Sequence, residues 1–178
     1  VVGEEKGHLI CSTACLGSEF AFLVTKAQKD LEYAVRLKKF VTWCKDTFGE
    51  DFYIELQPSL QEDQINYNVA AVEYALKNNI KMTVTTDAHY LKAKDRLVHK
   101  AFLNSNDGER EIDAFYSATY FMKWEEVLEY CSYIPKDVME AIRLNTLEIQ
   151  NKCTSYSLDA GQVIPRIPYR LEEFSRLG

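Results

Sequence analysis

Short apolar runs alternate with amphipathic stretches along the first half of the chain. Residues 9–14, 52–56 and 80–86 are short and mostly apolar, aromatic or β-branched, which predicts buried strands. Residues 30–48 place apolar side chains near helical spacing, and Gly49 follows them as a typical residue at a helix C-terminus. The pattern therefore predicts three strands, with a long helix between the first two.

A second helix is predicted between the last two strands. Its apolar residues Ile65, Val69, Val72 and Leu76 form one stripe, and it ends near Asn78. Strands that alternate with helices at these intervals are typical of parallel strands joined by right-handed crossovers. We therefore expect an α/β sheet or barrel.

The second half of the chain changes to helices. Residues 95–103, 123–130 and 135–152 have helical patterns, and the last begins with a proline, which suits the first turn of a helix. Residues 104–114 are polar and contain Asn-Asp-Gly, which predicts an exposed loop. The prolines of residues 162–168 exclude regular structure and predict a connector.

These elements divide the chain into three expected parts. We assign residues 1–115 to an α/β part, residues 116–160 to a helical segment that closes it, and residues 161–178 to a linker. Because the sequence starts with Val1 and its first residues read as the middle of a protein, we expect a fragment of a longer chain.

Composition narrows the class of protein. The 178 residues are 47% hydrophobic and 27% charged, as in ordinary globular domains, and no apolar run approaches the roughly 20 residues of a membrane span. Five scattered cysteines without a CxxC pair indicate neither a disulfide framework nor a zinc knuckle. We expect a soluble, cytoplasmic protein. Its net charge of −6 predicts weak or no DNA binding by this segment alone.

Asp87 and His89 are the most informative candidates for chemistry. They lie two residues apart at the C-terminal end of the third predicted strand, and side chains at this spacing on an extended strand point the same way. Carboxylate and imidazole groups are ligands for zinc, manganese or iron, and active sites gather at the carboxyl ends of parallel strands. A capping aspartate beside a structural histidine is an equally open interpretation.

Cys15 is a third candidate metal ligand. It follows the first predicted strand, so it shares an edge with Asp87 and His89 if the strands are parallel. A thiolate would complete a three-ligand set. Free cysteines are more often small buried apolar residues, and this alternative stays open.

Other polar and aromatic residues favour structural roles. Glu55 and Gln57 share one face of the second strand; Glu55 could bind or orient a metal, but a structural carboxylate paired across the strand is the favoured interpretation. His99 lies in a predicted helix, where packing or capping is favoured. The aromatic residues between 115 and 121 could stack bases, but a packed core edge fits the acidic neighbourhood better.

Several motifs resemble the PHP domain of bacterial DNA polymerase III alpha subunits. Residues 7–19, GHLICSTACLGSE, are similar to a GLI-LSACLGGE stretch; residues 48–57, FGEDFYIELQ, resemble an FG-FYLELQ strand; residues 85–91, TTDAHYL, resemble TNDAHYL. A D-x-x-x-H helix and a closing pattern that starts with Asn-Thr follow in the same order. The residues that carry these last two patterns are Asp95, His99, Asn145, Thr146, Ile149 and Cys153.

The resemblance implies a partial, barrel-like (β/α) PHP domain with parallel strands, and a helical C-terminal part that leads to a polymerase domain. It implies a polynuclear site for zinc, manganese or iron, to which Cys15, Asp87 and His89 contribute. In this family the domain removes nucleotides from 3′ DNA ends or only supports the polymerase. The parent would use magnesium and would contact DNA and other replisome subunits.

Three departures limit this expectation. The family's early H-x-H metal motif is absent from the chain, Pro58-Ser59 replaces an Asp-His pair, and Ser18 replaces a glycine. The catalytic aspartates of the polymerase are also expected elsewhere. We therefore expect the fragment alone to be inactive and to self-associate through an exposed sheet edge. A stand-alone phosphoesterase of the histidinol-phosphatase type and a purely structural module are the alternatives.

Overall fold

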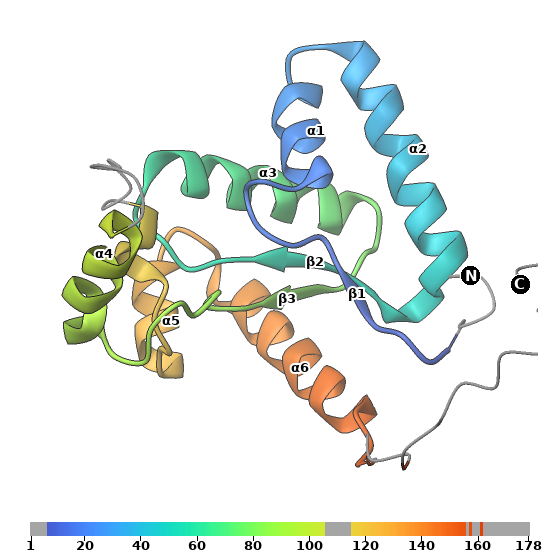
Figure 1. The fold of residues 1–178 in the computed structure, drawn as a ribbon. Helices are drawn as coiled ribbons and strands as arrows, with labels where there is room; N and C mark the ends of the chain where they lie inside the picture. Colours follow the sequence, from blue (N-terminus) through green and yellow to red (C-terminus); the bar gives the residue numbers. More distant parts are fainter. Residues whose placement is uncertain (1–6, 106–114, 156, 158–160, 162–178) are drawn as a thin grey trace, which may run out of the picture.

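The fold is mixed α/β, built on a parallel three-stranded sheet (Figure 1). The computed structural model describes residues 7–105, 115–155, 157 and 161. In the sheet, β2 (Phe52–Leu56) is central, with β1 (Cys11–Ser12) on one side and β3 (Met82–Val84) on the other. Both pairings are parallel, which confirms the α/β class.

Helices cover the sheet on two sides (Figure 1). The helices α1 (Glu19–Ala27), α2 (Leu31–Phe48) and α3 (Glu62–Lys77) form one layer, in which α1 contacts both of the others. On the other side, α6 (Lys136–Lys152) packs on β3. Strands β2 and β3 therefore lie between two helical layers, as hydrophobic strands of a parallel sheet require, and β1 at the edge is only partly covered.

The remaining helices lie at the carboxyl end of the strands (Figure 1). They are α4 (Arg96–Asn104) and α5 (Trp124–Tyr130), together with short 3₁₀ turns at Ala93–Asp95 and Phe115–Ala118; a third 3₁₀ turn, Gly49–Asp51, precedes β2. A parallel bridge between Tyr90 and Tyr120 joins this group to the end of β3. No described helix is long and apolar enough to cross a membrane.

Local sequence signals fix the ends of the helices. The side chain of Ser18 accepts a hydrogen bond from the Ala21 N–H at 3.1 Å, and Asp30 caps α2 in the same way through the Glu32 N–H. α2 ends at Gly49, whose φ of 58° is unfavourable for residues with a side chain. The helix predicted over residues 30–48 is confirmed.

Three sequence-based expectations differ from the structure. The first strand, predicted as buried over residues 9–14, is shorter: β1 spans Cys11–Ser12, and Leu9 and Ile10 before it are 46% and 37% exposed, because β1 lies at the edge of the described sheet. Helix α1 was not predicted: its buried residues Phe20, Ala21, Leu23 and Val24 do recur at helical spacing, but residues 20–24 form a continuous apolar run that is too short to distinguish a helix from a buried strand. The predicted apolar stripe of α3 is wrong in part, since Val69 and Leu76 are 39% and 60% exposed. The buried face of α3 instead carries Tyr67, Asn68 and small alanines, because short side chains allow the helix to approach the sheet closely.

A charged cluster attaches α6 to the amino end of the sheet. The ammonium of Lys152 lies 2.7 Å from Glu148 and 2.8 Å from Asp51, and it donates to the Tyr53 hydroxyl. Lys81, just before β3, reaches the same Glu148 carboxylate at 2.9 Å. These two lysines lower the pKa of Glu148 to about 2, so this carboxylate stays charged at neutral pH.

The predicted part boundaries and the connector remain predictions. Most of the loop predicted over residues 104–114, and the connector over residues 162–168, lie outside the described residues. The barrel-like closure of the sheet also stays a prediction.

Candidate functional site

Glu55 occupies the centre of the carboxyl half of the sheet. It lies in β2, is 8% exposed, and each oxygen of its carboxylate accepts a hydrogen bond from a neighbouring strand segment. The Ser12 hydroxyl of β1 donates to Oε2, and the Thr85 hydroxyl just after β3 donates to Oε1, both at 2.5 Å. The Gln57 amide donates a longer bond, of 3.4 Å, to Oε1. One buried carboxylate therefore links all three strands.

The backbone of Glu55 is held as firmly as its side chain. Its N–H donates to the Thr13 hydroxyl at 2.9 Å, and its carbonyl accepts a 2.8 Å bond from the Tyr67 hydroxyl of α3. Burial raises the pKa of Tyr67, so this phenol remains a hydrogen-bond donor throughout the physiological range. Helix α3 and strand β1 are thus tied to the same residue of β2.

Asn68 connects α3 to more distant parts of the chain. Its side chain is fully buried and donates to the Gln57 carbonyl at 2.8 Å and to the Tyr133 hydroxyl at 2.6 Å. Its own amide oxygen accepts from Gln64 at 3.0 Å. Buried amides are costly unless all their hydrogen bonds are made, so this residue fixes the position of the loop after β2 against the segment that precedes α6.

A polar cavity of about 360 Å³ opens at this end of the sheet. Its walls come from the segment after β2, from the start of α3 and from the segments that follow β1 and β3. The lining residues are Leu16, Gln57, Pro58, Ser59, Gln61, Glu62, Asp63, Gln64, Thr86, Ala118 and Thr119. The cavity lies where parallel α/β folds bind ligands.

The three predicted metal ligands lie around this cavity but do not line it. Cys15 and Asp87 are half-buried. Cys15 immediately precedes the lining residue Leu16, and Asp87 immediately follows the lining residue Thr86. Asp87 has a φ of 45°, which turns the chain sharply away from β3. His89 is exposed; its Nδ1 lies 2.6 Å from the Asp87 carbonyl, to which the ring N–H donates.

His89 also belongs to an aromatic cluster. Its ring centroid lies 5.5 Å from that of His99 on α4, and both imidazoles lie 4.9 Å from the Tyr116 ring. Burial, followed by the neighbouring His89, lowers the pKa of His99, which favours the neutral imidazole at His99. The packing role predicted for His99 is confirmed by these ring contacts.

The donor set does not by itself form a metal centre. Within residues 7–105 and 115–155, no three His, Cys, Asp or Glu side chains are gathered as a group that could hold a metal ion. Glu55 is already engaged by hydroxyl donors. The ligand roles of Cys15, Asp87 and His89 therefore stay predictions, and a closed site would need further ligands.

Sequence reasoning missed the residues that hold Glu55. Ser12, Thr13 and Thr85 are small hydroxyl residues at strand ends, and Tyr67 lies within a helix pattern. One signal could have found them. Hydroxyl residues stand at the ends of the first and third strands, and the second strand, between them, contains a glutamate that these hydroxyls can bind.

The site defines the chain as a parallel α/β unit with a polar cavity at the carboxyl edge of its sheet, and comparisons with known proteins add its relatives. No protein-family model matches the chain. Over 177 residues it is 38% identical to "Probable DNA polymerase YorL" of Bacillus subtilis (strain 168) and equally to "DNA-directed DNA polymerase" of Bacillus phage SPbeta. Each of these matches covers 94% of the chain and 14% of the relative.

A "DNA polymerase III subunit alpha" of Borreliella burgdorferi is 28% identical over 177 residues, which cover 96% of the chain and 14% of that protein. The chain is thus similar to a segment of DNA polymerases, including DNA polymerase III alpha subunits. It spans about one seventh of the length of these relatives. The resemblance to alpha subunits is confirmed, and the assignment of the segment to a PHP domain stays a prediction.

Proposed function

We propose that this chain is a PHP-type segment of a replicative DNA polymerase, and that it supports the polymerase polypeptide structurally. The polymerase part of the proposal draws on relatives that match nearly the whole chain. The structural role draws on one observation: at the edge of the sheet where a catalytic carboxylate would act, both oxygens of Glu55 are bound by the Ser12 and Thr85 hydroxyls.

This hydrogen bonding favours support over chemistry. A buried carboxylate that is satisfied by neutral hydroxyls stabilises the junction of strands, and any ligand would have to displace those donors. Since Cys15, Asp87 and His89 do not complete a metal group by themselves, we derive no reaction step from a zinc, manganese or iron ion. We also propose that the longer protein has DNA and other replisome subunits as partners and that its polymerase uses magnesium as a cofactor.

A metal-dependent 3′–5′ exonuclease in the longer protein is the second candidate function. One observation favours it: His89 donates from Nδ1 to the Asp87 carbonyl, which leaves Nε2 as an acceptor, the arrangement common among metal-binding histidines. The comparisons lend no support to a stand-alone phosphoesterase of the histidinol-phosphatase type.

Two substitutions in a polymerase polypeptide that includes this segment separate the candidates. Asn68→Ala leaves buried partners unsatisfied, at a cost of about 1–3 kcal/mol for each group, and should lower both the melting temperature and primer extension. The double substitution Asp87→Ala and His89→Ala should leave primer extension nearly unchanged.

Degradation of 3′ DNA ends decides between the two functions. The supporting role predicts no metal-dependent shortening of a labelled primer by either variant or by the parent sequence. Shortening by the parent sequence that disappears in the Asp87→Ala, His89→Ala protein, with primer extension retained, would establish the exonuclease instead.

A further inference from the structure

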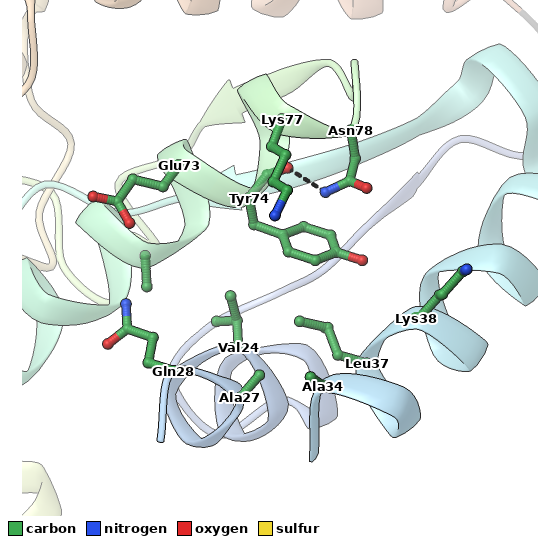
Figure 2. A pocket seen from close by; sticks show the side chains of 11 residues that line it. Val24, Ala27, Gln28, Ala34, Leu37, Lys38, Glu73, Tyr74, Lys77 and Asn78 are labelled. Atoms are coloured by element: carbon green, nitrogen blue, oxygen red, sulfur yellow. Dashed lines mark hydrogen bonds between the residues drawn. The ribbon is translucent and has the colours of Figure 1, made fainter. Parts of the chain in front are cut away.

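A pocket of about 370 Å³ lies within the layer formed by α1, α2 and α3 (Figure 2). Its floor is apolar, with Val24 and Ala27 of α1, Leu37 of α2 and Ala70 of α3. One end is closed by Asn78, the residue that caps the C-terminus of α3. The polar cavity described above is lined by the first turn of α3, so the two hollows lie at opposite ends of this helix.

The rim of the pocket carries two lysines that have no acidic partner among the described residues. Figure 2 shows Lys77 of α3 beside the Tyr74 ring and Lys38 of α2 on the side toward which the Tyr74 hydroxyl points. Neither ammonium makes an ion pair or a hydrogen bond with any residue that the structure describes. Glu73, the acidic residue of the lining, points away from Lys38 in Figure 2.

The apolar character of the pocket continues along α2. Leu31 is 80% exposed and lies three residues before Ala34 and seven before Lys38, so all three share one stripe of the helix. An exposed leucine beside an apolar hollow is a surface that a partner would desolvate favourably. Phosphate backbone is a poor occupant, because its affinity needs clusters of cations rather than an apolar floor.

We propose that this pocket is the docking site of an acidic peptide segment of a partner protein, which inserts one or two large apolar side chains between α1, α2 and α3. The volume suits such an anchor, and a few polar groups at the rim fix its orientation. The chain as a whole has a net charge of −6, so Lys38 and Lys77, which pair with no acidic residue in the described part of the chain, are a local feature complementary to carboxylates that flank the anchor.

The binding test uses the full 178-residue chain and a defined probe, the fluorescein-labelled peptide Asp-Glu-Leu-Phe-Asp-Glu. Fluorescence anisotropy should show saturable binding that weakens with salt. The peptides Lys-Lys-Leu-Phe-Lys-Lys and Asp-Glu-Ala-Ala-Asp-Glu should each bind at least about tenfold more weakly, because one loses the charge match and the other loses the anchor. Amide shifts in ¹⁵N-labelled protein should map to Val24, Ala34 and Ala70.

Three variants locate the site. The pair Lys38→Glu and Lys77→Glu should weaken the acidic peptide by about tenfold or more, and Ala34→Phe should fill the floor and block it. Lys39→Glu is the matched control: it changes an exposed lysine of α2 that does not line the pocket, and it should leave affinity unchanged.

Equal affinity for the acidic and basic peptides, amide shifts elsewhere on the chain, or equal effects of the Lys38→Glu, Lys77→Glu pair and Lys39→Glu would overturn the proposal. So would binding of free phenylacetate in the pocket without binding of the peptide, since the occupant would then be a small carboxylate. Circular dichroism of each variant excludes unfolding as the cause of lost binding.

Discussion

At the scale of single residues, Glu55 has the densest set of interactions at the carboxyl edge. Its side chain accepts from Ser12 and Thr85, and its backbone is bound by Thr13 and Tyr67. The sequence supported a structural carboxylate at this position, and the structure agrees. The sequence pattern could not identify the four partners, because they are distant in the chain. Thr13 and Ser12 lie 42 and 43 residues before Glu55, and Tyr67 and Thr85 lie 12 and 30 residues after it.

Replacing Thr85 tests the contribution of one hydroxyl. Thr85→Val keeps the β-branched shape but removes the donor to Glu55 Oε1, so we expect a loss of about 1–3 kcal/mol in the free energy of unfolding. Urea unfolding monitored by tryptophan fluorescence measures this change.

Thr25 provides the control, because its hydroxyl donates to the Ala21 carbonyl on an accessible part of α1. Thr25→Val should change the free energy of unfolding by less than about 0.5 kcal/mol. Equal losses for the two variants would mean that the Thr85 hydroxyl has no special role in holding Glu55.

At the scale of elements, α6 is fastened to β3 by polar contacts at several points. The Asn145 amide donates to the Met82 carbonyl at 2.9 Å, and the hydroxyls of Thr146 and Thr83 lie 3.1 Å apart. The Asn-Thr pair noted in the sequence therefore has a structural role at the helix–strand contact. Glu148 adds the charged contact near the C-terminal end of the helix.

The charged contact predicts a pH dependence of stability. The pKa of Glu148 falls from its usual 4.5 to about 2 on folding, so its stabilising effect is complete above pH 4.5 and is lost as the pH falls toward 2. The difference in free energy of unfolding between the native sequence and Glu148→Gln should therefore shrink steadily between pH 4.5 and pH 2.

Urea titrations at several pH values in this window measure the difference. Glu140→Gln serves as a comparison, because Glu140 pairs with Arg143 on the exposed side of α6 and contacts no strand in doing so. A Glu148→Gln difference that is constant from pH 5 to pH 2 would contradict a charged Glu148 in the folded protein.

The elements themselves were predictable where one physical signal dominated. Strand β2 is buried along its whole length because helices cover both of its faces, and its bounds match the expected range. Helix α3 was placed correctly, but its inner face was not: Tyr67 and Asn68 are buried because their polar atoms find partners, which no hydrophobic stripe shows. The residues of the site come together only through the crossovers between the strands. Tertiary packing determines these crossovers, so the sequence pattern alone does not predict the site.

At the scale of the whole molecule, the net charge and the hydrogen-bonded Glu55 carboxylate at the sheet edge both predict that this segment alone neither binds nor cleaves DNA. A chain with a net charge of −6 has a weak electrostatic attraction for phosphate backbone. We predict that the 178-residue chain neither retains single-stranded DNA at physiological salt nor shortens a 3′-labelled strand in the presence of zinc or manganese.

Anisotropy and denaturing gels measure these two properties. The Asp87→Ala, His89→Ala protein, purified in the same way, shows whether any observed cleavage comes from a contaminant. Metal-dependent shortening by the native sequence that this variant lacks would contradict the prediction and would assign chemistry to these residues.

Because β1 and β3 are short, the hydrogen bonds of Glu55 affect how the outer strands align with β2 during folding. Strands of two and three residues form too few ladder bonds to select one alignment over another. If β1 slid by one residue, Ser12 would turn to the opposite face and its hydroxyl would lose Glu55; Thr85 constrains β3 in the same way. A single buried carboxylate therefore sets the register of both outer strands, and its loss should produce slipped, competing alignments rather than a uniformly weaker sheet.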